Sequence, residues 1–207
     1  MMKFRLMSLL CVTAFFVSAA NALPTSGVYD GWGPETLLFS FVVDGRTLSG
    51  SIDCAVYESY QGNAQLDGQY VYAYQIFSSG SNVSIDSFSV AIFENAGVLS
   101  ITYDDPEQIG GVNPSYVYFS PDQQTAQSAA YVFLPLPGFP GVIPNGGKST
   151  VLLFSSNNVP TRGFGIIEGG SAAGVVNNLP TPVPEPATIV LLGISSAAVC
   201  TMRKRRG

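Results

Sequence analysis

Three carboxylates, Asp104, Asp105 and Glu107, lie within four residues of one another around Pro106. They form the densest group of side chains in the sequence that could bind a metal ion. Carboxylate oxygens are the ligands that Ca²⁺ prefers, and this ion is available outside the cytoplasm. The spacing is not that of an EF-hand loop, and no glycine stands at the turn position of such a loop. The sequence therefore leaves two alternatives, a speculative calcium site and a solvated turn after a strand.

Catalytic groups are restricted because the chain contains no histidine. This removes the commonest general base and the commonest metal ligand, and it makes a Ser-His-Asp triad impossible. A pair of carboxylates could still hydrolyse a glycosidic bond, but their separation across a cleft is not encoded in sequence spacing. We therefore expect a protein that is not an enzyme and has no cofactor other than the possible Ca²⁺. A carboxylate-based hydrolase remains as an alternative.

A row of tyrosines, Tyr70, Tyr72 and Tyr74, alternates with apolar residues in the segment from Gly68 to Phe77. Period-two alternation places the three rings on one face of a strand. We expect this face to lie in the core of a sheet protein. The alternative is a carbohydrate-binding module, because aromatic rings offer flat apolar area with a polar group attached.

The cysteines do not form a disulfide framework. Cys11 lies in an apolar run at the N-terminus and Cys200 in another at the C-terminus, so only Cys54 belongs to the body of the protein. A single cysteine cannot form an internal disulfide. We expect Cys54 to be a buried, inert thiol rather than a reactive one, because apolar residues alternate around it.

The body between residues 23 and 182 is acidic. It contains 3 of the 9 Lys and Arg residues and 13 of the 14 Asp and Glu residues, which gives a net charge of 3 − 13 = −10. This balance excludes the basic surface of a nucleic-acid-binding protein. Acidic polysaccharides would also be repelled unless divalent cations bridged them.

The elements that must position these residues are strands. No stretch of the body has a sustained helical period, and short apolar, β-branched or aromatic segments recur between turn signals. Asp44-Gly45 predicts a hairpin turn, and a change of phase near Asp86-Ser87 predicts a bulge or bend. The fold class expected is all-β, an antiparallel β-sandwich or jelly roll over residues 23–168. The uncharged segment 169–182, rich in Gly, Ala, Asn, Val and Pro, is expected to be a flexible linker. The expected strands cover residues 36–44, 47–57, 68–77, 83–85, 88–92, 98–103, 116–119, 129–134, 149–155 and 164–168.

Residues 1–22 have the pattern of a secretory signal peptide. Lys3 and Arg5 precede the apolar segment 6–17, and Ala20 and Ala22 stand at the small positions of a cleavage site. Cleavage after Ala22 would make Leu23 the first residue of the mature protein.

The C-terminal segment 183–207 has three zones. The first is the motif Val183, Pro184, Glu185 and Pro186, in which the two prolines hold the acid in an extended conformation. The second is the uncharged run 187–202, expected to be a transmembrane helix although its length of about 24 Å is short for a bilayer. The third is the tail 203–207, which begins with the cations Arg203, Lys204, Arg205 and Arg206 and should remain in the cytoplasm.

This segment resembles a PEP-CTERM sorting signal. The Pro184-Glu185-Pro186 core, its context from Val183 to Thr188 and the terminal basic cluster carry the resemblance. The resemblance implies an exported protein that signal peptidase and an exosortase process, with an inner-membrane intermediate whose ectodomain lies outside the cytoplasm. It also implies a final location at the cell surface or in the extracellular matrix and an association with exopolysaccharide or biofilm. A permanent membrane anchor that no enzyme cuts is the alternative. Segments 68–90 and 152–165 resemble ectodomains that often precede this tag, a resemblance that supplies no site.

Overall fold

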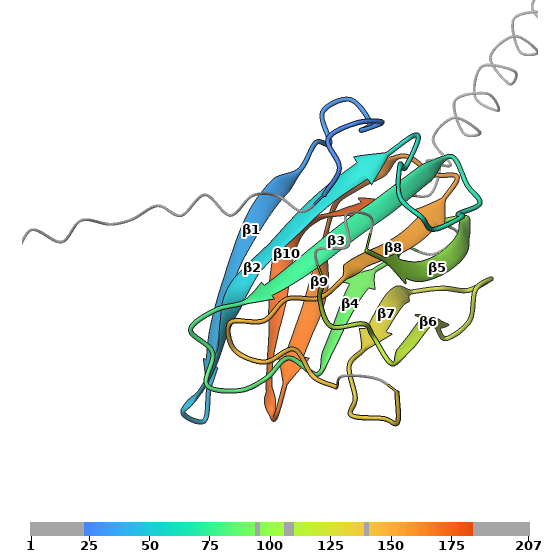
Figure 1. The fold of residues 1–207 in the computed structure, drawn as a ribbon. Coiled ribbons are helices and arrows are strands. Elements are labelled where there is room, and N and C mark those ends of the chain that lie inside the picture. The colour runs from blue at the N-terminus through green and yellow to red at the C-terminus, as the bar shows by residue number, and fades with distance from the viewer. Residues whose placement is uncertain (1–22, 94–95, 106–109, 139–140, 184–207) are drawn as a thin grey trace, which may run out of the picture.

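The computed structural model describes residues 23–93, 96–105, 110–138 and 141–183, and these contain ten strands and no helix. The strands form two five-stranded antiparallel sheets that face each other as two layers (Figure 1). The expected all-β sandwich is therefore confirmed. The strands are β1 (Glu35–Val43), β2 (Arg46–Tyr57), β3 (Tyr70–Ser78), β4 (Ser87–Ala91), β5 (Val98–Asp104), β6 (Tyr116–Ser120), β7 (Ser128–Val132), β8 (Val151–Ser156), β9 (Pro160–Gly169) and β10 (Ala172–Pro182).

The chain alternates between the two layers. Sheet 1 has the strand order β1-β2-β3-β8-β5, and sheet 2 has the order β10-β9-β4-β7-β6. The edge strands β1 and β10 lie next to each other along one open side of the sandwich, and β5 lies near β6 along the other. Long-range antiparallel pairing therefore holds the fold together without any disulfide among the described residues.

Local sequence accounts for the turn and the bend that were predicted. Asp44 and Gly45 both adopt positive φ, of 50° and 74°, as a two-residue hairpin turn between β1 and β2 requires. Ile85 forms an isolated bridge with Ile143 before β4 begins at Ser87. The chain changes partner at this point, so the change of phase in the sequence marks a real break in the ladder.

The main core lies between the sheets and is rich in aromatic rings. Tyr72 stacks on Phe154 with ring centroids 4.8 Å apart, and Tyr74 packs edge-on against Phe88. Tyr70, Tyr72 and Tyr74 are all buried. The tyrosine row is thus core, as expected, and the alternative of a sugar-stacking face at these three residues is wrong.

Strand β3 is buried on its other face as well. Val71 and Ala73 belong to a second cluster on the outer side of sheet 1, beneath the N-terminal segment and the loop that precedes β3. Leu23, the expected first residue of the mature protein, is 2% exposed and packs in this cluster. The Tyr57 hydroxyl fixes the same segment by donating to the Pro24 carbonyl oxygen at 2.7 Å.

The linker prediction for residues 169–182 is wrong, because 172–182 form strand β10, paired with β9 throughout its length. A bulge between Asn177 and Leu179 shifts the register by one residue. Asn178 takes a positive φ of 67° there. The bulge breaks the period-two pattern: Val176 and Leu179 both point into the core although they are three residues apart. Proline is tolerated near the end of β10 because this strand is an edge.

Arg162 on β9 stabilises the bulged region. Its guanidinium donates to the Asn178 carbonyl oxygen at 2.9 Å and forms an ion pair with Glu35 of β1. The same guanidinium lies 4.5 Å from the centroid of the Trp32 ring. One cation therefore ties together strands β1, β9 and β10 at the end of the sandwich from which the chain leaves. Strand β9 also begins earlier than expected, at Pro160 rather than Phe164.

Candidate functional site

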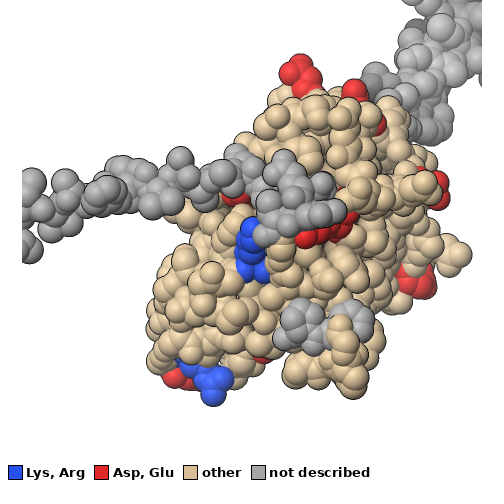
Figure 2. All heavy atoms as spheres, in the orientation of Figure 1, with Lys and Arg blue, Asp and Glu red and all other residues tan. Residues whose placement is uncertain are grey.

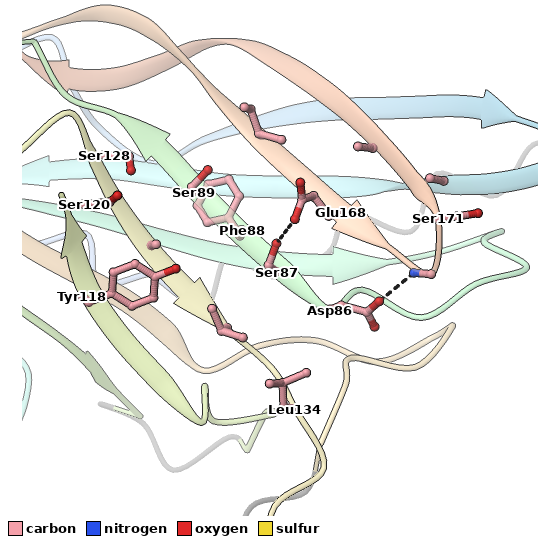
Figure 3. A pocket seen from close by; sticks show the side chains of 16 residues that line it. Asp86, Ser87, Phe88, Ser89, Tyr118, Ser120, Ser128, Leu134, Glu168 and Ser171 are labelled. Atoms are coloured by element: carbon pink, nitrogen blue, oxygen red, sulfur yellow. Dashed lines mark hydrogen bonds between the residues drawn. The ribbon is translucent and has the colours of Figure 1, made fainter.

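The outer face of sheet 2 carries a groove of about 560 Å³ (Figure 3). The registers of the paired strands place one row of outward-facing residues straight across the sheet. From β6 to β10 this row contains Tyr118, Ala130, Ser89, Ile166 and Val175. The central residues are small and those on either side are large, so the sheet face is hollowed along β4 and β7.

The neighbouring row also has a small residue at its centre and larger ones on either side, and one of the larger residues is a glutamate. It contains Tyr116, Val132, Ser87, Glu168 and Ala173. Tyr116 is 52% exposed and lies outside the lining of the groove, whereas the other four residues contribute to it.

Two carboxylates at this end of the groove are held in place. Glu168 accepts a hydrogen bond of 2.7 Å from the Ser87 hydroxyl, and Asp86 accepts one of 2.7 Å from the Gly170 backbone N–H. Both contacts are drawn in Figure 3. No lysine or arginine belongs to the described lining. The groove is therefore a hydrogen-bonding surface of acidic character.

The predicted calcium ligands are not brought together as a group among the described residues, in which no cluster of three metal-binding side chains occurs. Glu107 lies outside the described residues. Asp104 is 8% exposed, and its carboxylate accepts hydrogen bonds from Asn63 N at 2.7 Å and Tyr60 Oη at 3.2 Å. Asp104 also accepts from Asp105 N at 2.9 Å. Through the hydrogen bonds from Asn63 and Tyr60, Asp104 holds the loop after β2 against the end of β5.

Cys54 is a buried free thiol, as expected. It is fully buried between the sheets and lies 3.6 Å from a carboxylate oxygen of Glu35. Burial, followed by the negative charge of Glu35, raises the pKa of the Cys54 thiol far above its usual range. The thiolate needed for nucleophilic or redox chemistry is therefore strongly disfavoured.

The C-terminal motif is reached directly from the sandwich. Strand β10 ends at Pro182, and Val183 N donates to Val159 O at 3.1 Å. Of the predicted motif, only Val183 is described. The other expected tail and signal residues lie outside the described part: Ala20, Ala22, Pro184, Glu185, Pro186, the run 187–202, Arg203, Lys204, Arg205 and Arg206.

The described residues include no helix with the length and apolar character needed to cross a membrane. The expected transmembrane segment 187–202 is outside them and remains a prediction.

The fold and the C-terminal segment together define a β-sandwich protein that ends in a sorting signal. Residues 182–206 match a family model described as the PEP-CTERM protein-sorting motif. The chain therefore carries a PEP-CTERM sorting signal, which marks it for export by exosortase-type sorting, through a membrane-associated intermediate on the way to the cell surface. The match begins at Pro182, so the sorting signal and strand β10 share a residue.

The chain matches no curated protein and no solved structure.

Proposed function

We propose that this chain is a non-enzymatic protein of the cell surface or extracellular matrix, released from its membrane intermediate by an exosortase and associated with exopolysaccharide. The observation that carries the proposal is the sorting motif at residues 182–206. A chain without histidine lacks the side chain that enzymes use most often as a general base. Export followed by structural association with the matrix therefore agrees better with the sequence than catalysis does.

The architecture supports delivery of an intact domain. In the described part of the chain, both cores are built from residues between Leu23 and Leu179, which lie inside the segment that would remain after loss of the signal peptide and the tail. Few basic side chains are visible on the face shown in Figure 2. A surface with few cations suits a neutral or cation-bridged matrix better than a directly bound polyanion.

The experiment compares wild type with Glu185→Gln in the producing bacterium, and Glu58→Gln serves as the matched control because Glu58 is exposed and far from the tail in sequence. We expect wild type and the control to leave the membrane and to appear in the surface and matrix fractions. Glu185→Gln should accumulate in the membrane with its basic tail. Equal processing of Glu185→Gln and wild type would contradict the sorting part of this proposal.

The matrix association is tested separately on the processed wild-type protein. Removal of polysaccharide from the matrix should release the processed protein into the soluble fraction. Retention at the cell surface after depletion would contradict the association with exopolysaccharide and would leave the sorting assignment intact.

A further inference from the structure

We propose that the groove on the outer face of sheet 2 binds an extended, neutral polysaccharide chain. This inference deepens the proposed matrix association and rests on it. The site lies on the opposite face of the sheet from the tyrosine core, and none of Tyr70, Tyr72 and Tyr74 lines it.

The shape of the groove suits a single extended chain. Its floor consists of small residues on the two adjacent strands β4 and β7, including Ser89, Ser128 and Ala130. The sides are formed by Tyr118 on β6 and Ile166 on β9, which are 47% and 37% exposed. Strands β6 and β9 are three strand spacings apart, about 14 Å, so a trough of this width runs along the strands.

Hydroxyl groups on the groove surface are available to a ligand. The side chains of Ser89, Ser120 and Ser128 point into the groove (Figure 3). In the described part of the chain these three hydroxyls have no hydrogen-bond partner, in contrast to Ser87, which donates to Glu168. Hydroxyls that can both donate and accept match the hydroxyls of a sugar. The exposed Tyr118 ring adds an apolar surface for the face of a sugar ring.

The charged side chains that line the groove favour a glycan without net charge. Asp86 and Glu168 contribute two carboxylates, and the described lining contains no lysine or arginine. The Arg46 guanidinium lies beside Gly170 at one end only, so an anionic glycan would be repelled along most of the groove. A second copy docked through the same face would bring two surfaces of the same acidic character together. An extended peptide gains most of its affinity from backbone pairing with a free sheet edge, whereas the groove lies on the face of the sheet, over β4 and β7. A neutral glycan is not repelled by the carboxylates and does not need a free sheet edge.

The test measures binding by isothermal titration calorimetry with the exported protein purified from the producing cells. Cellohexaose, laminarihexaose and mannohexaose serve as neutral probes, and an alginate hexasaccharide serves as the anionic probe. We expect at least one neutral probe to bind and the alginate probe to bind at least about tenfold more weakly, because of the acidic lining. If none of the three neutral probes binds, the proposal is overturned.

Two variants locate the binding site. Tyr118→Ala should weaken binding of the neutral probe about tenfold, the effect of losing one stacked ring. Ser89→Trp should abolish it by filling the floor. The control Tyr116→Ala removes an equally exposed tyrosine from the same strand and should change the affinity by less than about twofold.

Unchanged unfolding temperatures must accompany these results, and Tyr118→Ala suffices if Ser89→Trp does not fold. Wild-type affinity in Tyr118→Ala, or tighter binding of alginate, would contradict the groove proposal. Such a failure is distinguishable from failure of the proposed function, which is measured by processing of the tail and by retention in the matrix.

Discussion

Val183 donates its backbone N–H to the carbonyl oxygen of Val159 at 3.1 Å. This contact continues the β9–β10 pairing one residue beyond Pro182, to the position immediately before Pro184. The sorting motif therefore starts where the sandwich ends, with no spacer between them. An enzyme that cuts at the motif must approach close to the folded domain.

Strand β10 should be essential for the stability of the domain. Leu179 is completely buried, so Leu179→Ala should lower the free energy of unfolding by about 2–5 kcal/mol. Val175 lies on the same strand but is 50% exposed. Val175→Ala should therefore change the free energy of unfolding by less than about 0.5 kcal/mol. Chemical unfolding followed by tyrosine fluorescence measures both. Equal, small effects would show that 172–182 behave as a tether after all.

Asp53 should make the protein less stable as the pH rises. The side chain is 1% exposed. One carboxylate oxygen accepts from Thr36 Oγ1 at 2.6 Å, and the other has no hydrogen-bond partner among the residues that the structure describes. Burial raises the pKa of Asp53, and the hydrogen bond from Thr36 opposes this shift in part. Because the folded protein holds the proton more tightly than the unfolded chain, the favourable contribution is complete below the unfolded pKa of about 3.9. It is lost as the pH rises through the folded pKa.

Asp53→Asn removes this ionisation and should therefore stabilise the protein at pH 7, because no charge then has to be held in the buried site. The gain should shrink toward pH 3. Asp44→Asn, in the exposed β1–β2 turn where asparagine also tolerates positive φ, is the matched control. Thermal unfolding between pH 3 and pH 8 measures the difference. A constant offset between Asp53→Asn and wild type over this range would contradict the ionisation argument.

Asp104 should stabilise the protein by fixing the loop after β2. Asp104→Ala leaves Asn63 N and Tyr60 Oη without their acceptor and should cost about 1–3 kcal/mol in unfolding free energy. Asp30→Ala removes an exposed carboxylate that has no hydrogen bond or ion pair among the described residues, and it should be neutral. The same melting experiment addresses the calcium hypothesis: if Asp104 acts only through the loop, neither EDTA nor added Ca²⁺ changes the wild-type melting temperature.

Cys54 should be unreactive in the folded protein. Its thiol is fully buried and its pKa is raised, so an aromatic disulfide reagent should modify it only after unfolding. Labelling rates with and without denaturant measure this. Rapid labelling of the native protein would indicate that the sheets open readily around β2.

The sandwich could be predicted because its strands are short, alternate clearly and are separated by strong turn signals. The Asp44-Gly45 turn and the tyrosine row of β3 each identify their element from local chemistry alone. Strand β10 could not be identified in this way. Its bulge at Asn178 breaks the alternation, and its stability comes from pairing with β9 and from the Arg162 contact, both of which are tertiary.

The groove could not be predicted from the sequence either. Ser89, Ala130 and Ile166 are far apart along the chain and become neighbours only through the registers of β4 with β7 and with β9. The small residues Ser87, Ser89, Ser128 and Ala130 in the outward phase of β4 and β7 were the available signal. Without the strand order, however, no pattern indicated that these two strands are adjacent.

The central claim, that the chain is exported and cut at its sorting motif, is tested most directly by the intact mass of the protein isolated from the surface of the producing bacterium. We predict a polypeptide that starts at Leu23 and ends near Glu185. A mass that still includes Arg203 to Arg206 would contradict processing and would indicate a permanently anchored protein.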